Sequence, residues 1–514
     1  MIKYRNPVIK GFNPDPSICR VDDDYYLVTS TFEFFPGVPV YHSKNLVDWK
    51  LINYCLTRDS QLNLKGCRPS GGIYAPTIRY HEGIFYMITT NVSSGGNFIV
   101  HTNDVYGKWS EPSWIDHHGI DPSLLFDDDG RVYFCGTDNE TGGIAFFEIN
   151  PLTGDKLSEK KIISYGAGGK CPEAPHIYKI NAYYYLMIAE GGTEYGHMET
   201  IFRSKSPYGP YKPCPHNPIL SHKDFMGSSI QATGHADIVE DTNGNWWLVC
   251  LGIRPLPGVM LHNLGRETFL APLDWDEDGW PVVGDQGRIS MEMEGELPAP
   301  LNSPETSTDI SFEYNDELND DFYDNFNDGD LKLEWNFARN PERDNYSLTE
   351  KKGFLKLSAG PETLNDSEPT FLGIRQKEFE VTARTGLTLD FSSDEEKQKA
   401  GLTAYYSQDY HYEIYITHEE GKDFVVLSKR VHDIECVDEK LEINYQGKIE
   451  LMIETGTEDY MFSYRLQDDW VKLGAAKTAG LCTEGTMTMT FTGTYLGIFA
   501  SNTDAYFGYF SVYQ

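Results

Sequence analysis

The sequence predicts an all-β protein, with a five-bladed β-propeller followed by a β-sandwich. Three observations lead to this prediction. A strand–turn–strand pattern recurs through the first part of the chain, alternating strands without that period fill the last part, and nothing reads as a long amphipathic helix. A chain of 514 residues is also too long for one ordinary domain. We therefore expect a propeller over residues 1–285, a linker over 286–320 and a sandwich over 321–514.

The repeated unit of the first part is a β-hairpin. Each copy has a small or polar start, an apolar pair, a turn rich in Asp, Asn or Gly, and an aromatic β-run. The copies begin roughly 45 to 60 residues apart, which is the period of a four-stranded propeller blade. A second strand–turn–aromatic segment follows in fixed order, which favours blades over an array of β-sandwiches. The copies are DPSICRVDDDYYLVTS from Asp15, APTIRYHEGIFYMITT from Ala75, DPSLLFDDDGRVYFCGT from Asp121, APHIYKINAYYYLMIAE from Ala174 and HADIVEDTNGNWWLVCLG from His235.

The rest of the chain changes character twice. Residues 286–320 are rich in Pro, Ser, Thr and acids, which is typical of a linker. Alternating strands then return, as in AGLTAYYSQDYHYEIYIT from Ala400 and KIELMIETGTEDYMFSYRL from Lys448. About 190 residues of such strands suit one β-sandwich.

The composition limits the partners and the compartment. With a net charge of −35 and no cluster of Lys and Arg, neither nucleic acid nor an anionic membrane is an expected partner, and a neutral ligand fits better. The nine Cys are odd in number and lack framework spacing, which favours free thiols in a reducing compartment. The start MIKYRNPVIKGF has no apolar h-region, and no apolar run is long enough for a membrane span. We expect a cytoplasmic protein, and a homo-oligomer is left open.

Propeller geometry is expected to bring several acids together. The first strand of each blade lies nearest the axis, so residues at the starts of these strands converge on one end of the channel. Asp15, Asp121 and Glu173 are three such residues. Clustered acids cost electrostatic energy unless their pKa values separate or function requires them. Asp-Pro-Ser at Asp15 is also ordinary turn chemistry, but the convergence favours a functional role.

Long, ordered motifs occur at these positions and beyond them. They are NPDPS at Asn13, STFEFFPGVPVYHSKNLVDW at Ser30, SGGIYAPTIRYHEG at Ser70, DPSLLFDDDG at Asp121, CPEAPHIYKINAYYYLMIAEGGTEYGH at Cys171, GHADIVE at Gly234, LGRETFL at Leu264 and DDFYDNFNDGDLKLEWNFARNP at Asp320. Over essentially the whole chain, the sequence resembles glycoside hydrolase family 43, in particular its β-xylosidases and α-L-arabinofuranosidases with a C-terminal β-sandwich. That resemblance implies a concanavalin-like jelly roll for the sandwich.

The resemblance implies an inverting hydrolysis on the propeller. Asp15 corresponds to the general base, Glu173 to the general acid, and Asp121 to the residue that tunes and orients the acid. An inverting enzyme needs two carboxyl groups about 6.5–9.5 Å apart with a water molecule between the base and the anomeric carbon. Glu173 must hold a proton at neutral pH, and a negative Asp121 nearby would raise its pKa. No cofactor is required.

Substrate contacts are also implied by the resemblance. Phe32 and Tyr74 look like walls of a pocket for the terminal sugar, with core packing as the alternative. Arg266 is expected to donate to sugar hydroxyls or to pair with a carboxylate, with a salt bridge inside a blade as the alternative. Thr193 is expected to hydrogen-bond near the acid or to serve a turn.

Two residues have more divided expectations. In some relatives the histidine that matches His235 approaches a calcium ion through water, so Ca²⁺ in the channel is the one metal considered, although no dense oxygen-ligand loop is present. Phe491, in MTFTGTYLG from Met489, is the candidate for a sandwich residue at the rim of the pocket, with a core strand position as the alternative. A rim blocked in this way predicts exo-action on chain ends.

Two positions depart from the β-xylosidase pattern. Tyr74 stands where those enzymes have Trp, and Ile120 stands where they have Phe. A smaller wall resembles the arabinofuranosidase branch, so we expect release of α-L-arabinofuranosyl and β-D-xylosyl units from xylan- or arabinoxylan-derived oligosaccharides. A non-catalytic carbohydrate-binding propeller is the alternative, but it need not keep the three acids. A retaining enzyme of the invertase type would need its nucleophile about 5–5.5 Å from the acid, and its motifs are not present.

Overall fold

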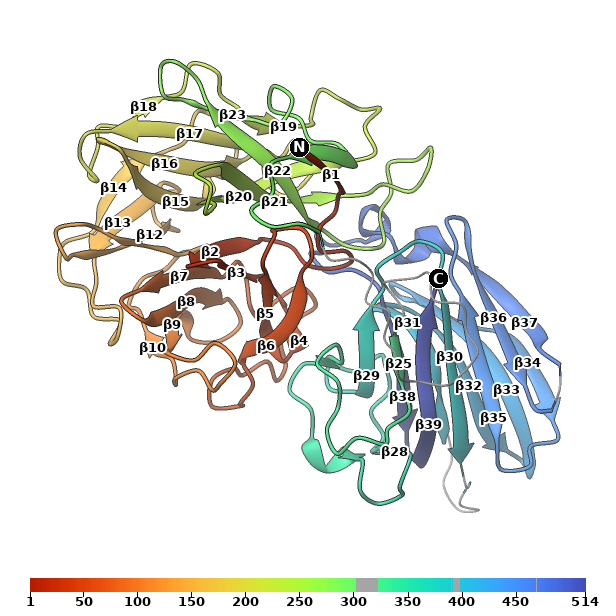
Figure 1. Ribbon diagram of the computed structural model, residues 1–514. Coiled ribbons are helices and arrows are strands. Elements are labelled where there is room, and N and C mark those ends of the chain that lie inside the picture. Colours follow the sequence, from red (N-terminus) through yellow and green to blue (C-terminus); the bar gives the residue numbers. More distant parts are fainter. Residues whose placement is uncertain (302–321, 390, 392–397, 468) are drawn as a thin grey trace. The chain divides into compact units, whose positions relative to one another are not determined.

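The computed structural model describes residues 1–301, 322–389, 391, 398–467 and 469–514, which form two units (Figure 1). Unit 1 comprises residues 1–64, 71–255 and 266–301, and unit 2 comprises residues 65–70, 256–265 and the described residues after 301. The fold is all-β, and the helices of the described ranges are the short 3-10 helices η1 (Arg343–Asn345), η2 (Thr478–Leu481) and η3 (Thr483–Gly485). Among these residues no helix is long and apolar enough to cross a membrane.

Unit 1 is a five-bladed β-propeller, which confirms the expected fold (Figure 1). Five antiparallel sheets follow one another along the chain, and the first four strands of each lie in chain order, while β19 (Leu220–Ser221) of the fourth sheet pairs with β17 (Met198–Ser204). The first strands of the five sheets contact one another in a closed ring; they are β2 (Ser17–Val21), β7 (Thr77–His81), β11 (Ser123–Phe126), β15 (Glu173–Ile180) and β20 (Gln231–Glu240). These strands are therefore the innermost ones, as the repeat predicts.

The strands of unit 1 have the following bounds. Blades 1 to 3 contain β2 (Ser17–Val21), β3 (Asp24–Val28), β5 (Gly37–Ser43) and β6 (Lys50–Leu56); β7 (Thr77–His81), β8 (Ile84–Asn91), β9 (Gly96–Thr102) and β10 (Ser113–Trp114); and β11 (Ser123–Phe126), β12 (Val132–Thr137), β13 (Ile144–Glu148) and β14 (Lys161–Ser164). Blades 4 and 5 contain β15 (Glu173–Ile180), β16 (Tyr183–Glu190), β17 (Met198–Ser204), β18 (Lys212–Pro213) and β19 (Leu220–Ser221); and β20 (Gln231–Glu240), β21 (Trp246–Ile253), β22 (Glu267–Trp275) and β23 (Pro281–Val283). Outside the blades lie β1 (Ile2–Arg5), β4 (Phe34–Phe35) and β24 (Glu292–Gly295).

Local sequence accounts for the hairpins and the blade packing. Glu82 and Gly83 join β7 to β8 with φ of 48° and 85°, and two-residue hairpin turns favour positive φ at both positions. The aromatic and branched residues of the β-runs pack between neighbouring blades. Ile88 and Ile99 of blade 2, for example, share an apolar cluster with Phe134 of blade 3. Each blade thus buries its apolar faces against the next one.

The expected linker is wrong for its first part. Strand β24 pairs antiparallel with β1, with Gly295 opposite Ile2, and it belongs to unit 1. Leu297, only 7% exposed, joins the apolar cluster between blades 1 and 5. Pairing and apolar contacts therefore override the acidic composition of this segment. Residues 302–320 of the expected linker lie outside the described residues.

Unit 2 is a β-sandwich of two antiparallel sheets that enclose a large apolar cluster. One sheet contains β25 (Phe322–Asp324), β27 (Tyr346–Ser347), β28 (Leu355–Ser358), β39 (Asp504–Tyr513), β30 (Thr382–Leu389), β35 (Ile449–Glu454), β36 (Asp459–Arg465) and β37 (Val471–Lys477). The other contains β29 (Thr370–Arg375), β38 (Tyr495–Ser501), β31 (Lys399–Ser407), β32 (Tyr410–Glu419), β33 (Lys422–Val431) and β34 (Ile434–Ile443), and the short strand β26 (Phe337–Ala338) belongs to neither of these sheets.

Two short segments from the first part of the sequence belong to unit 2, which a contiguous division of the chain did not anticipate. Arg339 donates to the carbonyl oxygen of Cys67 at 2.6 Å, and the N–H of Thr494 donates to the carbonyl oxygen of Asn263 at 2.9 Å. These contacts depend on residues that lie far apart in the sequence.

Candidate active site

Three carboxyl groups from three blades lie at the beginnings of inner strands in unit 1. Asp15 and Asp121 each precede the first strand of their blade by two residues, and Glu173 opens β15. The backbone is left-handed at Asp15, at Asp121 and at Ala174, next to Glu173, with φ of 56°, 55° and 50°. Such conformations cost non-glycine residues about 1–3 kcal/mol each and concentrate at functional sites. The blades therefore repeat one strained backbone feature at Asp15, at Asp121 and directly after Glu173.

Asp15 has the surroundings of an ionised carboxylate. It is buried; Ser30 donates its hydroxyl to Oδ2 at 2.5 Å, and Arg266 donates to Oδ1 at 3.0 Å. His235 Nδ1 lies 3.5 Å from the same oxygen. Burial raises the pKa of Asp15, but Arg266, His235 and the Ser30 hydrogen bond outweigh it and hold the pKa below its ordinary value. Asp15 is thus able to accept a proton at neutral pH.

The pKa values of Glu173 and Asp121 are raised, in contrast to that of Asp15. Burial raises the pKa of Glu173 to about 7, and the negative charge of Asp15 adds to this effect while Arg266 opposes it. Burial also raises the pKa of Asp121, and the charges of Glu173 and Asp15 add to it. Repulsion between Glu173 and Asp121 acts on the two groups as a pair, so the expected effect of Asp121 on the acid stays a prediction, and Asp15 is a further negative charge that raises the pKa of Glu173. The site holds a proton on the Glu173 and Asp121 side while Asp15 stays ionised.

Arg266 connects the acids to the loop that carries Thr193. Its Nη1 atom donates both to Asp15 Oδ1 at 3.0 Å and to Thr193 Oγ1 at 2.9 Å. Arg266 is 6% exposed, and its charge lowers the pKa of Asp15. Of the two expectations for Arg266, the structure places it beside a carboxylate. Thr193 lies near the acids through this bond.

Two aromatic rings lie together in the same unit. The rings of Phe32 and Tyr74 are 5.1 Å apart, and the guanidinium of Arg266 lies 5.4 Å from the ring centre of Phe32. Phe32 has a φ of 49°, and its N–H and carbonyl group bond to Ile73. Tyr74 is partly exposed, whereas Phe32 is 2% exposed. The structure thus places Phe32 beside Arg266 and Tyr74 beside Phe32, with Tyr74 as the more accessible ring.

Ile120 and Phe491, the other two predicted substrate contacts, are partly exposed. Ile120 is partly exposed, and its N–H donates to the hydroxyl of Thr137 at 2.7 Å, which fixes the backbone just before Asp121. Phe491 is a partly exposed residue of unit 2, where its N–H donates to Ser70 Oγ at 2.9 Å. Its role at a pocket rim stays a prediction.

Sequence reasoning missed the groups that support the acids. Glu190, at the end of β16, accepts the N–H groups of Ala167 and Gly169 at 2.6 Å each, and it thereby fixes the loop before Glu173. Glu199, fully buried, accepts the N–H of Ala236 at 3.0 Å beside His235, and burial raises its pKa. A signal was present, because Glu190 lies three residues before Thr193 in the motif that begins at Cys171.

His235 lies beside the carboxylate of Asp15. It has a φ of 50° and is buried; burial lowers its pKa, although Asp15 opposes that effect. In the part of the chain that the structure describes, no group of three or more His, Cys, Asp or Glu side chains could hold a metal ion. Ca²⁺ prefers six to eight oxygen ligands, and the expected approach of His235 to such an ion is through water, so Ca²⁺ in the channel stays a prediction.

The arrangement is suited to a reaction that needs a base and an acid together. Asp15 is ionised at neutral pH, Glu173 titrates near neutral pH, and Arg266 acts on both. Pairs of carboxyl groups whose surroundings separate their pKa values are typical of general acid–base catalysis.

Comparisons with known proteins cover both units. Residues 4–281 match the family model described as Glycosyl hydrolases family 43, and residues 323–513 match the Beta xylosidase C-terminal Concanavalin A-like domain. A non-reducing end α-L-arabinofuranosidase of Bacteroides ovatus is 43% identical over 505 residues, which cover 97% of this chain and 91% of that protein. A xylosidase/arabinosidase of Butyrivibrio fibrisolvens is 42% identical over 439 residues, with 82% and 81% covered. A solved structure described as Bacteroides ovatus Xyloglucan PUL GH43B has a TM-score of 0.92 and 41% identity, with 100% of both chains covered.

Proposed function

Since the chain belongs to glycosyl hydrolase family 43, we propose that it is an inverting, exo-acting hydrolase that releases terminal pentoses from neutral oligosaccharides. The terminal units are α-L-arabinofuranosyl and β-D-xylosyl, and both are substrates. The relatives support this choice, because they are described as an arabinofuranosidase that acts at the non-reducing end and as a xylosidase/arabinosidase. The single observation that carries the proposal is the opposite pKa shift of Asp15 and Glu173 in one site.

The proposed reaction is a single displacement. Asp15 takes a proton from a water molecule, whose oxygen attacks the anomeric carbon of the terminal pentose. Glu173 gives its proton to the glycosidic oxygen as the bond between that oxygen and the anomeric carbon breaks. Asp121 stays close to Glu173 and keeps the acid oriented. The carboxylate of Asp15 also favours the positive charge that develops on the sugar ring, while Arg266 keeps Asp15 ionised.

The proposal is tested by comparing rates on an aryl α-L-arabinofuranoside and an aryl β-D-xyloside, with proton NMR of the first product formed. We expect turnover of both substrates and release of a sugar with inverted anomeric configuration. Xylo- and arabinoxylo-oligosaccharides should release only monosaccharide at early times. Retention of configuration would exclude Asp15 as the base of a single displacement. Folded protein without activity on any of these substrates would favour the carbohydrate-binding propeller.

The pH profile of kcat/KM follows from the two pKa shifts. Glu173 acts when protonated, so activity falls as the pH rises through about 7, the pKa of Glu173. Asp15 acts when ionised, and its pKa is lowered, so activity falls only when the pH drops below the ordinary range of a carboxyl group. We therefore expect a broad bell-shaped profile, measured as initial rates at substrate concentrations well below KM. A profile that rises through pH 7 would contradict the assignment of Glu173 as the acid.

A further inference from the structure

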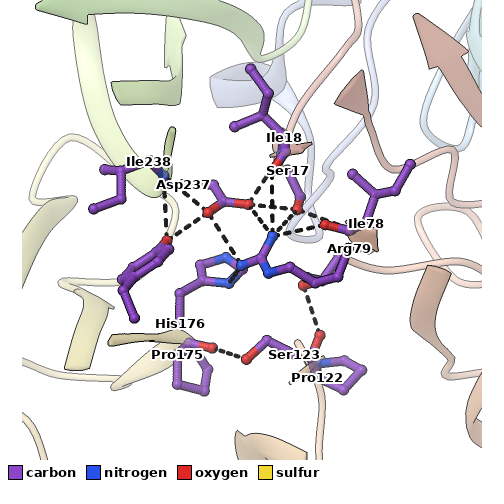
Figure 2. Close-up of polar contacts among 12 residues, drawn as sticks. Ser17, Ile18, Ile78, Arg79, Pro122, Ser123, Pro175, His176, Asp237 and Ile238 are labelled. Atoms are coloured by element: carbon purple, nitrogen blue, oxygen red, sulfur yellow. Dashed lines mark hydrogen bonds and ion pairs between the residues drawn. The ribbon is translucent and has the colours of Figure 1, made fainter. Parts of the chain in front are cut away.

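A closed ring of side-chain hydrogen bonds joins the inner strands of all five blades (Figure 2). Each bond joins one blade to the next. They run from Ser17 Oγ to Asp237 Oδ2 at 2.6 Å, from Ile78 N to Ser17 Oγ at 3.0 Å, from Thr77 Oγ1 to the carbonyl oxygen of Pro122 at 2.9 Å, from Ser123 Oγ to the carbonyl oxygen of Pro175 at 2.5 Å and from Tyr178 Oη to Asp237 Oδ1 at 2.6 Å.

Arg79 and Asp237 lie within this ring and bind each other with two contacts (Figure 2). Arg79 Nη1 donates to Asp237 Oδ2 at 2.7 Å, and Nη2 donates to Oδ1 at 3.2 Å and to His176 Nδ1 at 2.9 Å. Asp237 has no exposed surface. Burial lowers the pKa of His176 to about 3, so its neutral ring accepts the bond from Arg79. A buried bidentate pair of this kind fixes geometry because removal of one partner leaves a buried charge unpaired.

In the sequence, anchored residues of the ring follow the residues of the site by only two or three positions. Ser17 follows Asp15 by two residues, Ser123 follows Asp121 by two, His176 follows Glu173 by three and Asp237 follows His235 by two. A strand advances about 3.3 Å per residue, so each acid is only about 7–10 Å along the chain from an anchored side chain. The short path leaves little freedom between the anchor and the strained residue at the site.

We infer that Arg79 and Asp237 are positioning residues, which tie the inner strands together so that Asp15, Asp121 and Glu173 keep their mutual spacing. This inference rests on the proposed function, since spacing between a base and an acid matters for hydrolysis in a way that it does not for simple binding. A second inter-blade pair provides the contrast. Lys179 Nζ lies 2.6 Å from Asp127 Oδ1, and Tyr184 donates to Asp127 Oδ2 at 2.7 Å, beyond the end of β11 that is far from Asp121.

The test compares Tyr178→Phe with Tyr184→Phe, because each substitution removes one hydroxyl that donates to a carboxylate between blades. Arg79→Lys is expected to have the larger effect, since it keeps the buried positive charge but loses the bidentate contact with Asp237. We expect Arg79→Lys to lower kcat on the aryl pentoside about 10- to 100-fold, with KM within about 3-fold, because small displacements of catalytic groups are costly. Tyr178→Phe should lower kcat about 3- to 10-fold. Tyr184→Phe should lower Tm by about as much as Tyr178→Phe does, because each loses one hydrogen bond, but it should leave kcat within about 2-fold of the wild type.

The second readout does not depend on hydrolysis. In protein with ¹³C-labelled glutamate carboxyl groups, the signal lost in Glu173→Gln is that of Glu173, and its pKa is expected near 7 in the wild type and in Tyr184→Phe. In Arg79→Lys the pKa of Glu173 should move toward the ordinary range of a glutamate, because Glu173 is no longer held in its buried place beside Asp15. If Arg79→Lys and Tyr178→Phe lower Tm as Tyr184→Phe does but leave kcat and the pKa of Glu173 unchanged, the ring is only structural and the inference is wrong. If the wild type hydrolyses no pentoside, the proposed function fails, and the titration still decides whether the ring positions the acids.

Discussion

Replacement of Asp15 by Asn is expected to lower kcat about 10³- to 10⁴-fold on oligosaccharides and on aryl pentosides alike. The amide has nearly the same shape but cannot take a proton from water, and every substrate of a single displacement needs that step. KM should change little, because Ser30 and Arg266 still hold the side chain in place. The measurement is a steady-state comparison of kcat and KM on both substrate types.

Two further results accompany this change. The negative charge of Asp15 raises the pKa of Glu173, so residual activity of Asp15→Asn should decline at a lower pH than that of the wild type. Asp127→Asn is the matched control, because it makes the same chemical change at a buried carboxylate of unit 1 that is paired with Lys179. Folded Asp15→Asn protein with turnover like that of Asp127→Asn would refute Asp15 as the base.

Replacement of Glu173 by Gln is expected to separate substrates by their leaving groups. Hydrolysis of oligosaccharides should fall about 10²- to 10⁴-fold, because a sugar alkoxide leaves only when it is protonated. An aryl pentoside with a strongly acidic phenol as leaving group needs little protonation, so its kcat should fall far less. The alkaline decline of kcat/KM near pH 7 should disappear, since Glu173 no longer titrates.

Glu199→Gln provides the control for this assignment. Glu199 is another buried acid of blade 4 whose pKa is raised by burial, so it could in principle cause the same alkaline decline. We expect that decline to persist in Glu199→Gln and to be absent only in Glu173→Gln. An equal loss of activity on all leaving groups in Glu173→Gln would show that the residue does not act as the acid.

The opposed shifts of Asp15 and Glu173 also explain how one site keeps both forms of a carboxyl group at the same pH. Asp15 has a cation, a hydroxyl donor and an imidazole within hydrogen-bond or ion-pair distance. At Glu173, burial and the negative charge of Asp15 outweigh the opposing effect of Arg266. A buried charge is stable only where its partners outweigh the cost of burial, so the proton settles on Glu173 rather than on Asp15.

The sequence alone determined the repeated hairpins, the number of blades and the three candidate acids. These features follow from local patterns, because alternation, turn residues and aromatic runs act over a few neighbouring residues. Propeller geometry then requires the beginnings of the first strands to converge, so Asp15, Asp121 and Glu173 could be grouped without coordinates. The same local patterns misjudged residues 286–301, whose acidic composition concealed the pairing of β24 with β1.

Only the tertiary structure decided which groups surround each acid. Arg266 is 251 residues from Asp15 in the chain, and Arg79 is 158 residues from Asp237, so no local signal could pair them. The direction of each pKa shift depends on those partners and on burial, which are properties of the folded chain. Spacing along the sequence therefore indicated where the acids are, but the packing of five blades determined which acid keeps its proton.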